Sequence, residues 1–147
     1  MDIQLHTIPF QELSLEQLYQ LLKLRQEIFV LEQTCLYQDL DDKDQQSVHI
    51  LAEDKGEIVS CARAFWKNQE EKVAQIGRMC TRMSYRGQSL SLRVMAEAVR
   101  FCKENLGAAQ VYIEAQCYAI PFYEKLGFKV SSAEFLEDGI PHVEMIL

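Results

Sequence analysis

The chain has 147 residues, of which 48% are hydrophobic and 25% are charged, which favours one globular domain over residues 1–147. Its net charge of −7, from 15 basic and 22 acidic residues, argues against a nucleic-acid partner, because acidic groups repel the phosphate backbone. No signal-peptide layout and no apolar run of ~20 residues is present, so we expect a cytoplasmic protein without a membrane partner. Five cysteines without a C-x-x-C pair indicate neither a disulfide framework nor a zinc site.

The first predicted elements are a strand over 3–9 and a helix that begins after Ser14. Ser14 and Gln17 match a capping box, in which the two side chains satisfy free N–H groups at the start of a helix. Apolar residues then recur at helical spacing as far as Leu31, which predicts a helix of about 17 residues. The following segment, 34–47, is polar and acidic and predicts a loop or a short helix.

Three strands come next, over 48–53, 57–66 and 72–82, with turn sequences at 54–56 and 68–71. After a loop over 84–91, helical spacing predicts a second helix over 92–105, and Gly107 fits its C′ position. A strand over 110–116, a short helix over 119–126 and strands over 128–131 and 143–147 complete the chain. The predicted order is therefore a strand, a helix and an antiparallel meander, followed by a second half that contains both helices and strands.

One window of the acidic chain carries no acidic residue. No Asp or Glu occurs between Lys72 and Ala96, and four of the seven arginines lie there. The window spans a strand, a loop and a helix start, where free backbone N–H groups and the positive helix end attract phosphates. Arg82, Arg86 and Arg93 would add positive charge. The residues alone leave open whether this is a phosphate cradle for a small anion or a loop that is basic by chance.

Residues 86–91 resemble motif A of the GNAT N-acetyltransferases, R/Q-x-x-G-x-G/A, whose loop amides hold the pyrophosphate of acetyl-coenzyme A. Arg86 matches the first position, whereas Ser89 and Ser91 replace the usual small residues. A Cβ at Ser89 hinders the approach of the backbone to a phosphate and disfavours a positive φ. The serine hydroxyl can instead donate to a phosphate oxygen or cap the helix.

Residues 119–128 resemble a second family motif, A-x-x-F-Y-x-K-x-G-F, with Gln116 in place of the usual Asn. Residues 24–44, 76–78 and 137–142 are similar to the ElaA-type branch of the family, so the resemblance covers nearly the whole chain. It implies an α/β (α+β) GNAT acyl-CoA N-acyltransferase fold, with a mixed, mostly antiparallel sheet and helices on both faces. It also implies transfer of an acetyl group from acetyl-coenzyme A to a primary amine by direct attack, without a metal.

The resemblance further implies where the co-substrate binds. Residues 79–81 would offer backbone groups to the pantetheine arm, residues 86–91 would hold the pyrophosphate, and Gln116 would help to hold the arm. The expected cofactor-binding residues are Met79, Cys80, Thr81, Arg86, Gly87, Gln88, Ser89, Leu90, Ser91, Gln116, Phe122 and Tyr123.

Acyl transfer to an amine expels a thiolate, and a phenol near the sulfur can protonate it. The resemblance assigns this catalytic role to Tyr123, and the alternative is a tyrosine packed between helix and sheet. Glu114 and Glu32 are the first candidates for a base that deprotonates the amine. His49 and His142 are further candidates, because imidazole titrates near pH ~6.5. Deprotonation through water, without a dedicated base, stays open.

The aspartates at 39, 41, 42 and 44 do not match a calcium loop, because Asp44 stands where an EF-hand requires glycine. We expect a solvated acidic loop, or one that attracts a cationic amine. Two rivals to an acetyltransferase remain: a non-catalytic module that binds coenzyme A or a protein, and an acyltransferase with another acyl donor. The acceptor, a small-molecule or peptide amine, is not identified by the sequence, which also leaves a homodimer open.

Overall fold

The structure is a computed structural model that describes residues 2–147. Its strands are β1 (Gln4–Pro9), β2 (Val48–Asp54), β3 (Glu57–Asn68), β4 (Val73–Thr81), β5 (Gln110–Gln116), β6 (Lys129–Val130), β7 (Phe135–Glu137) and β8 (Ile140–Ile146). They form one sheet in the order β1-β2-β3-β4-β5-β8-β6, with β7 paired to β8. Among the residues described, β4 and β5 are the only strands that pair in parallel, so the sheet is mixed and mostly antiparallel, as the resemblance implies.

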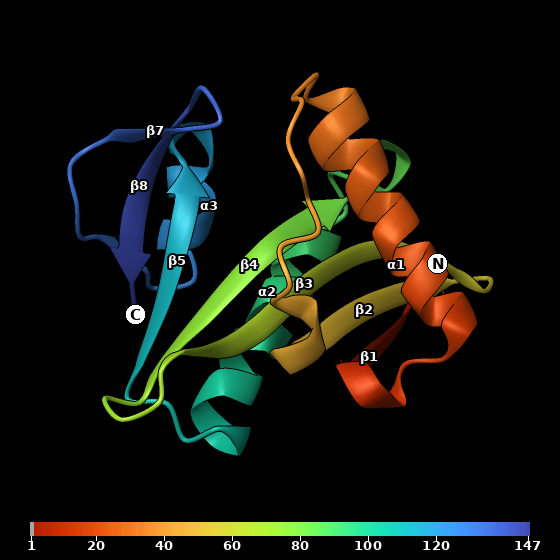
Figure 1. The fold of residues 1–147 in the computed structure, drawn as a ribbon, viewed down its shortest axis with the longest axis horizontal. Coiled ribbons are helices and arrows are strands. Elements are labelled where there is room, and N and C mark those ends of the chain that lie inside the picture. Colours follow the sequence, from red (N-terminus) through yellow and green to blue (C-terminus); the bar gives the residue numbers. More distant parts are fainter. Residues whose placement is uncertain (1) are drawn as a thin grey trace.

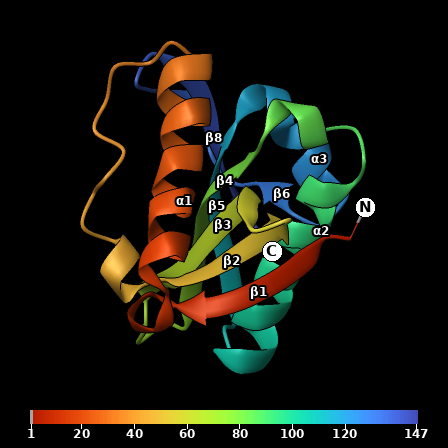
Figure 2. The ribbon, with the colours of Figure 1, turned by 90° about the vertical axis from the view of Figure 1, so that its right-hand side faces the viewer.

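The helices are α1 (Leu15–Arg25), α2 (Leu90–Arg100) and α3 (Ile120–Glu124), and π-helical segments η2 (Gln26–Glu32) and η5 (Phe101–Asn105) continue the first two. Short 3-10 turns lie at η1 (Phe10–Glu12), η3 (Asp44–Gln46), η4 (Met83–Tyr85) and η6 (Cys117–Ala119). Helix α1 covers one face of the sheet, and α2 and α3 cover the other (Figures 1 and 2). The predicted GNAT architecture is therefore confirmed.

Several predicted boundaries follow from local signals. The capping box at Ser14 is present, with both hydrogen bonds to Gln17 formed, and the first helix runs on through η2. The strand predicted over 110–116 coincides with β5. The second helix begins at Leu90, two residues before the predicted start, and its N-cap residue Ser89 makes no capping hydrogen bond through its side chain. Of the two roles that the sequence leaves open for the Ser89 hydroxyl, capping of this helix is therefore wrong.

Two apolar layers fill the space between the sheet and the helices. Under α1, the buried side chains are Leu21, Leu24, Ile28, Leu51, Ile58, Cys61 and Cys80. Under α2, a larger cluster includes Ile50, Val59, Ile76, Val94, Met95, Val111, Ile113 and Met145. The strands β2, β3 and β4 contribute to both layers because successive side chains of a strand point to opposite faces.

The acidic segment 34–47 is ordered by ion pairs rather than solvated. Arg25 pairs with Asp39 and Asp44, Arg63 pairs with Asp41 and Asp44, and Arg78 pairs with Asp39 and Asp41. Three guanidinium groups thus neutralise three carboxylates between α1 and the sheet. The expected solvated loop is therefore wrong, and the three arginines reduce the negative charge that this segment can offer to a cation.

Candidate active site

The sheet opens where its two parallel strands part. Strands β4 and β5 pair only over 73–75 and 110–112, and beyond these residues they diverge (Figure 1). Strand β4 also carries a bulge, because Arg78 and Met79 together oppose the single residue Ala62 of β3. Arg78 has a φ of 51°, and such a bulge bends the strand away from its neighbour.

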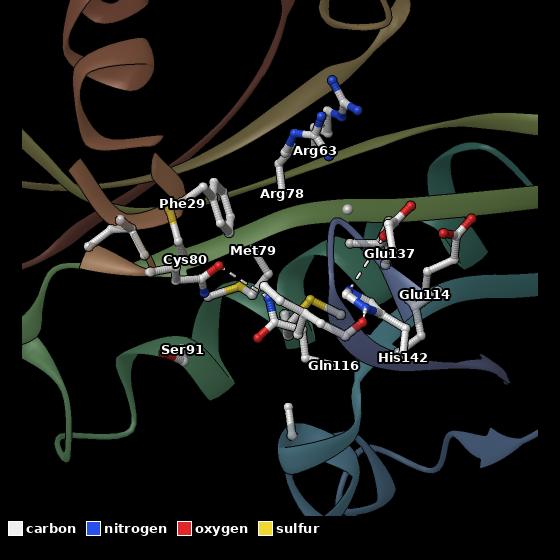
Figure 3. A pocket seen from close by; sticks show the side chains of 18 of the residues that line it. Phe29, Arg63, Arg78, Met79, Cys80, Ser91, Glu114, Gln116, Glu137 and His142 are labelled. Atoms are coloured by element: carbon white, nitrogen blue, oxygen red, sulfur yellow. Dashed lines mark hydrogen bonds and ion pairs between the residues drawn. The ribbon is translucent and has the colours of Figure 1, made fainter. Parts of the chain in front are cut away.

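A cleft of about 680 Å³ lies at this opening, within the range of roughly 300–1,000 Å³ that is typical of ligand pockets. Met79 and Cys80 lie on one side of it, and Glu114, Gln116, Glu137 and His142 on the other (Figure 3). The amide of Gln116 donates a hydrogen bond of 3.4 Å to the side chain of Gln33, which follows η2. The cleft is thus lined by segments that lie far apart in the sequence.

The loop before α2 turns through two positive φ angles, 79° at Gly87 and 62° at Ser89. Arg86 precedes both, and its Nε donates to the carbonyl oxygen of Thr81 at 2.8 Å. Its guanidinium also pairs with Glu32 at 2.8 Å. The loop is therefore fixed to the end of β4, and its start is tied to the end of η2.

A chain of hydroxyl groups joins α2 to β4 and β3. The Oγ of Ser91 lies 2.6 Å from Oγ1 of Thr81, which lies 2.7 Å from Oγ of Ser60. Because Ser60 donates its proton to the carbonyl oxygen of Cys80, Thr81 donates to Ser60 and Ser91 donates to Thr81. The Ser91 hydroxyl therefore uses its proton within the fold.

A family model for the acetyltransferase (GNAT) domain matches residues 11–147. The chain belongs to the GNAT acetyltransferase family. It is 39% identical to the UPF0039 protein Rv2851c of Mycobacterium tuberculosis over 140 residues, 92% of this chain and 87% of that one. It is 34% identical to the protein ElaA of Escherichia coli over 145 residues, 97% of this chain and 95% of that one. The ElaA-type branch is therefore confirmed.

Solved structures agree with this assignment. The crystal structure of Escherichia coli ElaA superposes with a TM-score of 0.92 at 34% identity and 98% coverage of both chains. An acyl-CoA N-acyltransferase from Pseudomonas aeruginosa also has a TM-score of 0.92, at 31% identity and 99% coverage of both chains. These similarities make the chain a GNAT acyltransferase of the acyl-CoA-dependent type.

Most residues of the predicted GNAT site line the cleft. They are Glu32, Met79, Cys80, Thr81, Arg86, Ser91, Glu114, Gln116, Phe122 and Tyr123. Gly87, Gln88 and Ser89 lie in the adjoining loop outside this lining, and the side chain of Leu90 is buried in the core under α2. Only a backbone group of Leu90 can therefore contact a ligand.

The side chain of Tyr123 packs against aromatic neighbours and also lines the cleft. Its ring makes edge-on contacts with Phe122 and Phe128, with centroids 5.0 Å and 6.0 Å apart. Burial raises the pKa of Tyr123, so its phenol stays protonated at neutral pH. Both interpretations offered by the sequence are thus compatible with its position.

The four candidate bases occupy different environments. Glu32 is held by Arg86, and His49 is fully buried outside the cleft, where its Nε2 faces the carbonyl oxygen of Asp44 at 3.0 Å. Burial lowers the pKa of His49. Glu114 and His142 both line the cleft. Sequence reasoning missed Glu137, which lies beside them on β7, a strand too short for a periodic signal.

The arginines of the basic window are largely neutralised. Arg78 pairs with Asp39, and Arg82 pairs with Glu27 and Glu57. The fixed positive charge expected from this window is therefore smaller than the sequence suggests. In the part of the chain that the structure describes, no group of three His, Cys, Asp or Glu side chains is arranged to hold a metal ion. Among these same residues, no helix is long and apolar enough to span a bilayer.

Proposed function

We propose that this chain transfers the acetyl group of acetyl-coenzyme A to a primary amine of a small molecule or a peptide. The observation that carries the proposal is the cleft at the parting of β4 and β5, whose lining includes residues of both family motifs. Arg86 and Ser91 come from the first motif, and Phe122 and Tyr123 come from the second. The amine attacks the thioester carbonyl directly, so the enzyme forms no covalent intermediate.

The edge of β4 fits the pantetheine arm of coenzyme A. Within residues 2–147, strand β4 pairs with β5 only as far as Gln75, so the same edge has no strand partner over 76–81. Backbone N–H and C=O groups need hydrogen-bond partners, and an extended ligand can supply them as an added strand would. Met79, Cys80 and Thr81 would then bind the amides of the arm through their backbone groups.

The loop over 86–91 would hold the pyrophosphate. Its backbone turns into the N-terminus of α2, where N–H groups and the helix dipole favour negative charge. Arg86 contributes positive charge once a phosphate competes with Glu32 for its guanidinium. Ser89 already adopts the positive φ that this motif position requires, so its side chain does not block the loop conformation.

Tyr123 would supply a proton to the departing thiolate. The phenol lines the cleft and is protonated at neutral pH, because burial raises its pKa. General acid catalysis of this kind contributes typically about 10²–10⁴-fold to a rate. Gln116, which lies across the cleft from Met79, would orient the thioester end of the arm (Figure 3).

Calorimetry and a thiol-release assay test this proposal together. We expect acetyl-coenzyme A to bind and coenzyme A to be released when primary amines or peptides with free N-termini are added. Absence of binding at millimolar concentration would overturn the enzyme assignment. Binding of acetyl-coenzyme A without release of coenzyme A in the presence of any amine would favour a non-catalytic module. Faster release of coenzyme A from a longer acyl-coenzyme A would show that the longer acyl group, and not acetyl, is preferred.

A further inference from the structure

One ring nitrogen of His142 makes a hydrogen bond to the backbone, and the other faces acidic groups of the cleft. The side chain lies on β8, is 7% exposed and lines the cleft. Its Nδ1 is 2.7 Å from the carbonyl oxygen of Ile140. A carbonyl oxygen only accepts hydrogen bonds, so Nδ1 carries the hydrogen and Nε2 of the neutral ring keeps its lone pair.

Acidic residues lie on two of the strands that pair with β8, namely β7 and β5. Oε2 of Glu137, on β7, lies 3.4 Å from Nε2, and Asp138 follows it in the turn to β8. Glu114 of β5 is paired with Glu144 of β8, two residue pairs along from the Gln116–His142 pair. Nε2 therefore faces the acidic wall of the cleft, with the Glu137 carboxylate beside it.

The ring is also held in a defined orientation. The ring of Phe135 on β7 stacks on the imidazole, with centroids 5.9 Å apart and planes 26° apart. Phe135 is the cross-strand partner of His142 on β7, and Gln116 is its partner on β5. Side chains of directly opposed residues are neighbours on one face of a sheet. His142 thus stands beside the residue that we expect to orient the thioester.

We propose that His142 is the general base of the acyl transfer and that Glu137 is its positioning residue. This inference rests on the proposed function. An acceptor amine arrives as an ammonium ion at neutral pH and has no lone pair for attack. The N–H bond of the ammonium breaks, its electrons stay on nitrogen, and the proton forms a new bond to Nε2 of His142. The Glu137 carboxylate stabilises the imidazolium, which later releases the proton to water.

The proton transfers that follow deprotonation of the amine involve the thiolate, the new amide nitrogen and Tyr123. The freed amine attacks the thioester carbonyl, and the C–S bond then breaks with its electrons on sulfur. Tyr123 donates its proton to that thiolate and takes back the surplus proton of the new amide nitrogen. Each turnover therefore yields the amide, the thiol and one proton, and that proton is the one that His142 carried to solvent.

A matched pair of substitutions isolates the base. His142→Asn keeps a nitrogen donor at the position of Nδ1 for the Ile140 carbonyl but removes Nε2. His6→Asn is the control, because His6 lies on β1 and pairs with Glu53 at 3.8 Å rather than facing the cleft. His142→Gln serves as a second variant, and thermal unfolding of each protein identifies any variant that does not fold.

Two acceptors separate deprotonation from the other steps. An alkylamine is protonated at neutral pH, whereas methoxyamine is not and needs no base. With acetyl-coenzyme A as donor, we expect His142→Asn to lower kcat/KM about 100-fold for the alkylamine and less than about threefold for methoxyamine. We expect Glu137→Gln to lower kcat/KM for the alkylamine and to leave it almost unchanged for methoxyamine, which a purely structural role would not do.

The outcomes are distinguishable. Equal losses for both acceptors, or no loss for either, would overturn the role of His142 while the activity of the wild-type protein upholds the proposed function. A wild-type protein that releases coenzyme A with neither acceptor would overturn both. The expected result is a selective loss with the alkylamine in both His142 variants and none in the His6 control.

Discussion

Nη1 of Arg25 lies 2.6 Å from Oδ1 of Asp44, and both side chains are almost completely buried. The same Asp44 oxygen accepts a hydrogen bond of 2.9 Å from Arg63 of β3. One carboxylate therefore joins the first helix, the acidic segment 34–47 and the middle of the sheet. Because Asp41 and Lys43 of this segment line the cleft, the ion pairs that fix the segment also shape the candidate site.

Asp44→Asn should destabilise the protein strongly. The substitution leaves two buried guanidinium groups short of a carboxylate, and removing one partner of a buried ion pair costs about 3–5 kcal/mol. Urea unfolding, followed by circular dichroism, measures this loss. Asp42→Asn is the matched control, because Asp42 is exposed and its φ of 64° suits asparagine. A loss in the control as large as that at Asp44 would contradict the role of the buried pair.

Stability should also fall in acid through the same groups. Burial alone would raise the pKa of Asp44, but hydrogen bonds and charge from Arg25 and Arg63 lower it. Arg63 likewise lowers the pKa of Asp41, against the effect of burial. A carboxyl whose pKa is lower in the folded state stabilises the fold above its unfolded pKa of about 3.9, and this stabilisation is lost as the pH falls through the folded pKa.

We therefore expect the free energy of unfolding to decrease steadily below about pH 4. In Asp44→Asn this decrease should be shallower, because only Asp41 of the two still titrates. Urea midpoints at several pH values between neutral and acid measure both slopes. Identical slopes in the variant and the wild-type protein would show that Asp44 does not carry the acid sensitivity.

Ser89→Gly should stabilise the loop before α2. Ser89 has a φ of 62° and makes no capping hydrogen bond through its side chain, so it bears the cost of a left-handed backbone without a compensating contact. Glycine adopts this conformation freely, and we expect a gain of about 1 kcal/mol. Ser89→Ala keeps the Cβ and should show no such gain. Thermal unfolding compares the three proteins, and equal gains in both variants would refute the explanation by backbone conformation.

The features predicted correctly from the sequence depend on neighbouring residues. The capping box at Ser14 needs only Gln17, and in β5 the apolar residues Val111, Ile113 and Ala115 recur at every second position of the sequence. The two motif segments likewise carry local signals, so the cleft residues of the loop and of α3 could be named in advance. By contrast, the bulge at Arg78 and the parting of β4 and β5 arise from pairing between distant strands.

Charge is the clearest case in which sequence reasoning fell short. The acidic segment and the basic window are separate stretches of the sequence, but Asp39 and Arg78 form an ion pair across 39 residues of chain. Further acidic side chains lie on the wall formed by β5, β7 and β8, where Glu114 and Glu137 line the cleft. No local pattern could assign partners to these charges, because the pairing is set by the folded sheet.

Tyr123→Phe tests the proposed acid most directly. The phenol packs against Phe122 and Phe128 through its ring, which the substitution preserves, so we expect the stability and the affinity for acetyl-coenzyme A to change little. Turnover should fall about 10²-fold, because the departing thiolate loses its proton donor. Tyr19→Phe, an exposed tyrosine on α1, is the matched control. Calorimetry gives the affinity, and the rate of coenzyme A release gives kcat between neutral and alkaline pH. Turnover equal to that of the wild-type protein at every pH would exclude Tyr123 as the acid and leave it a packing residue.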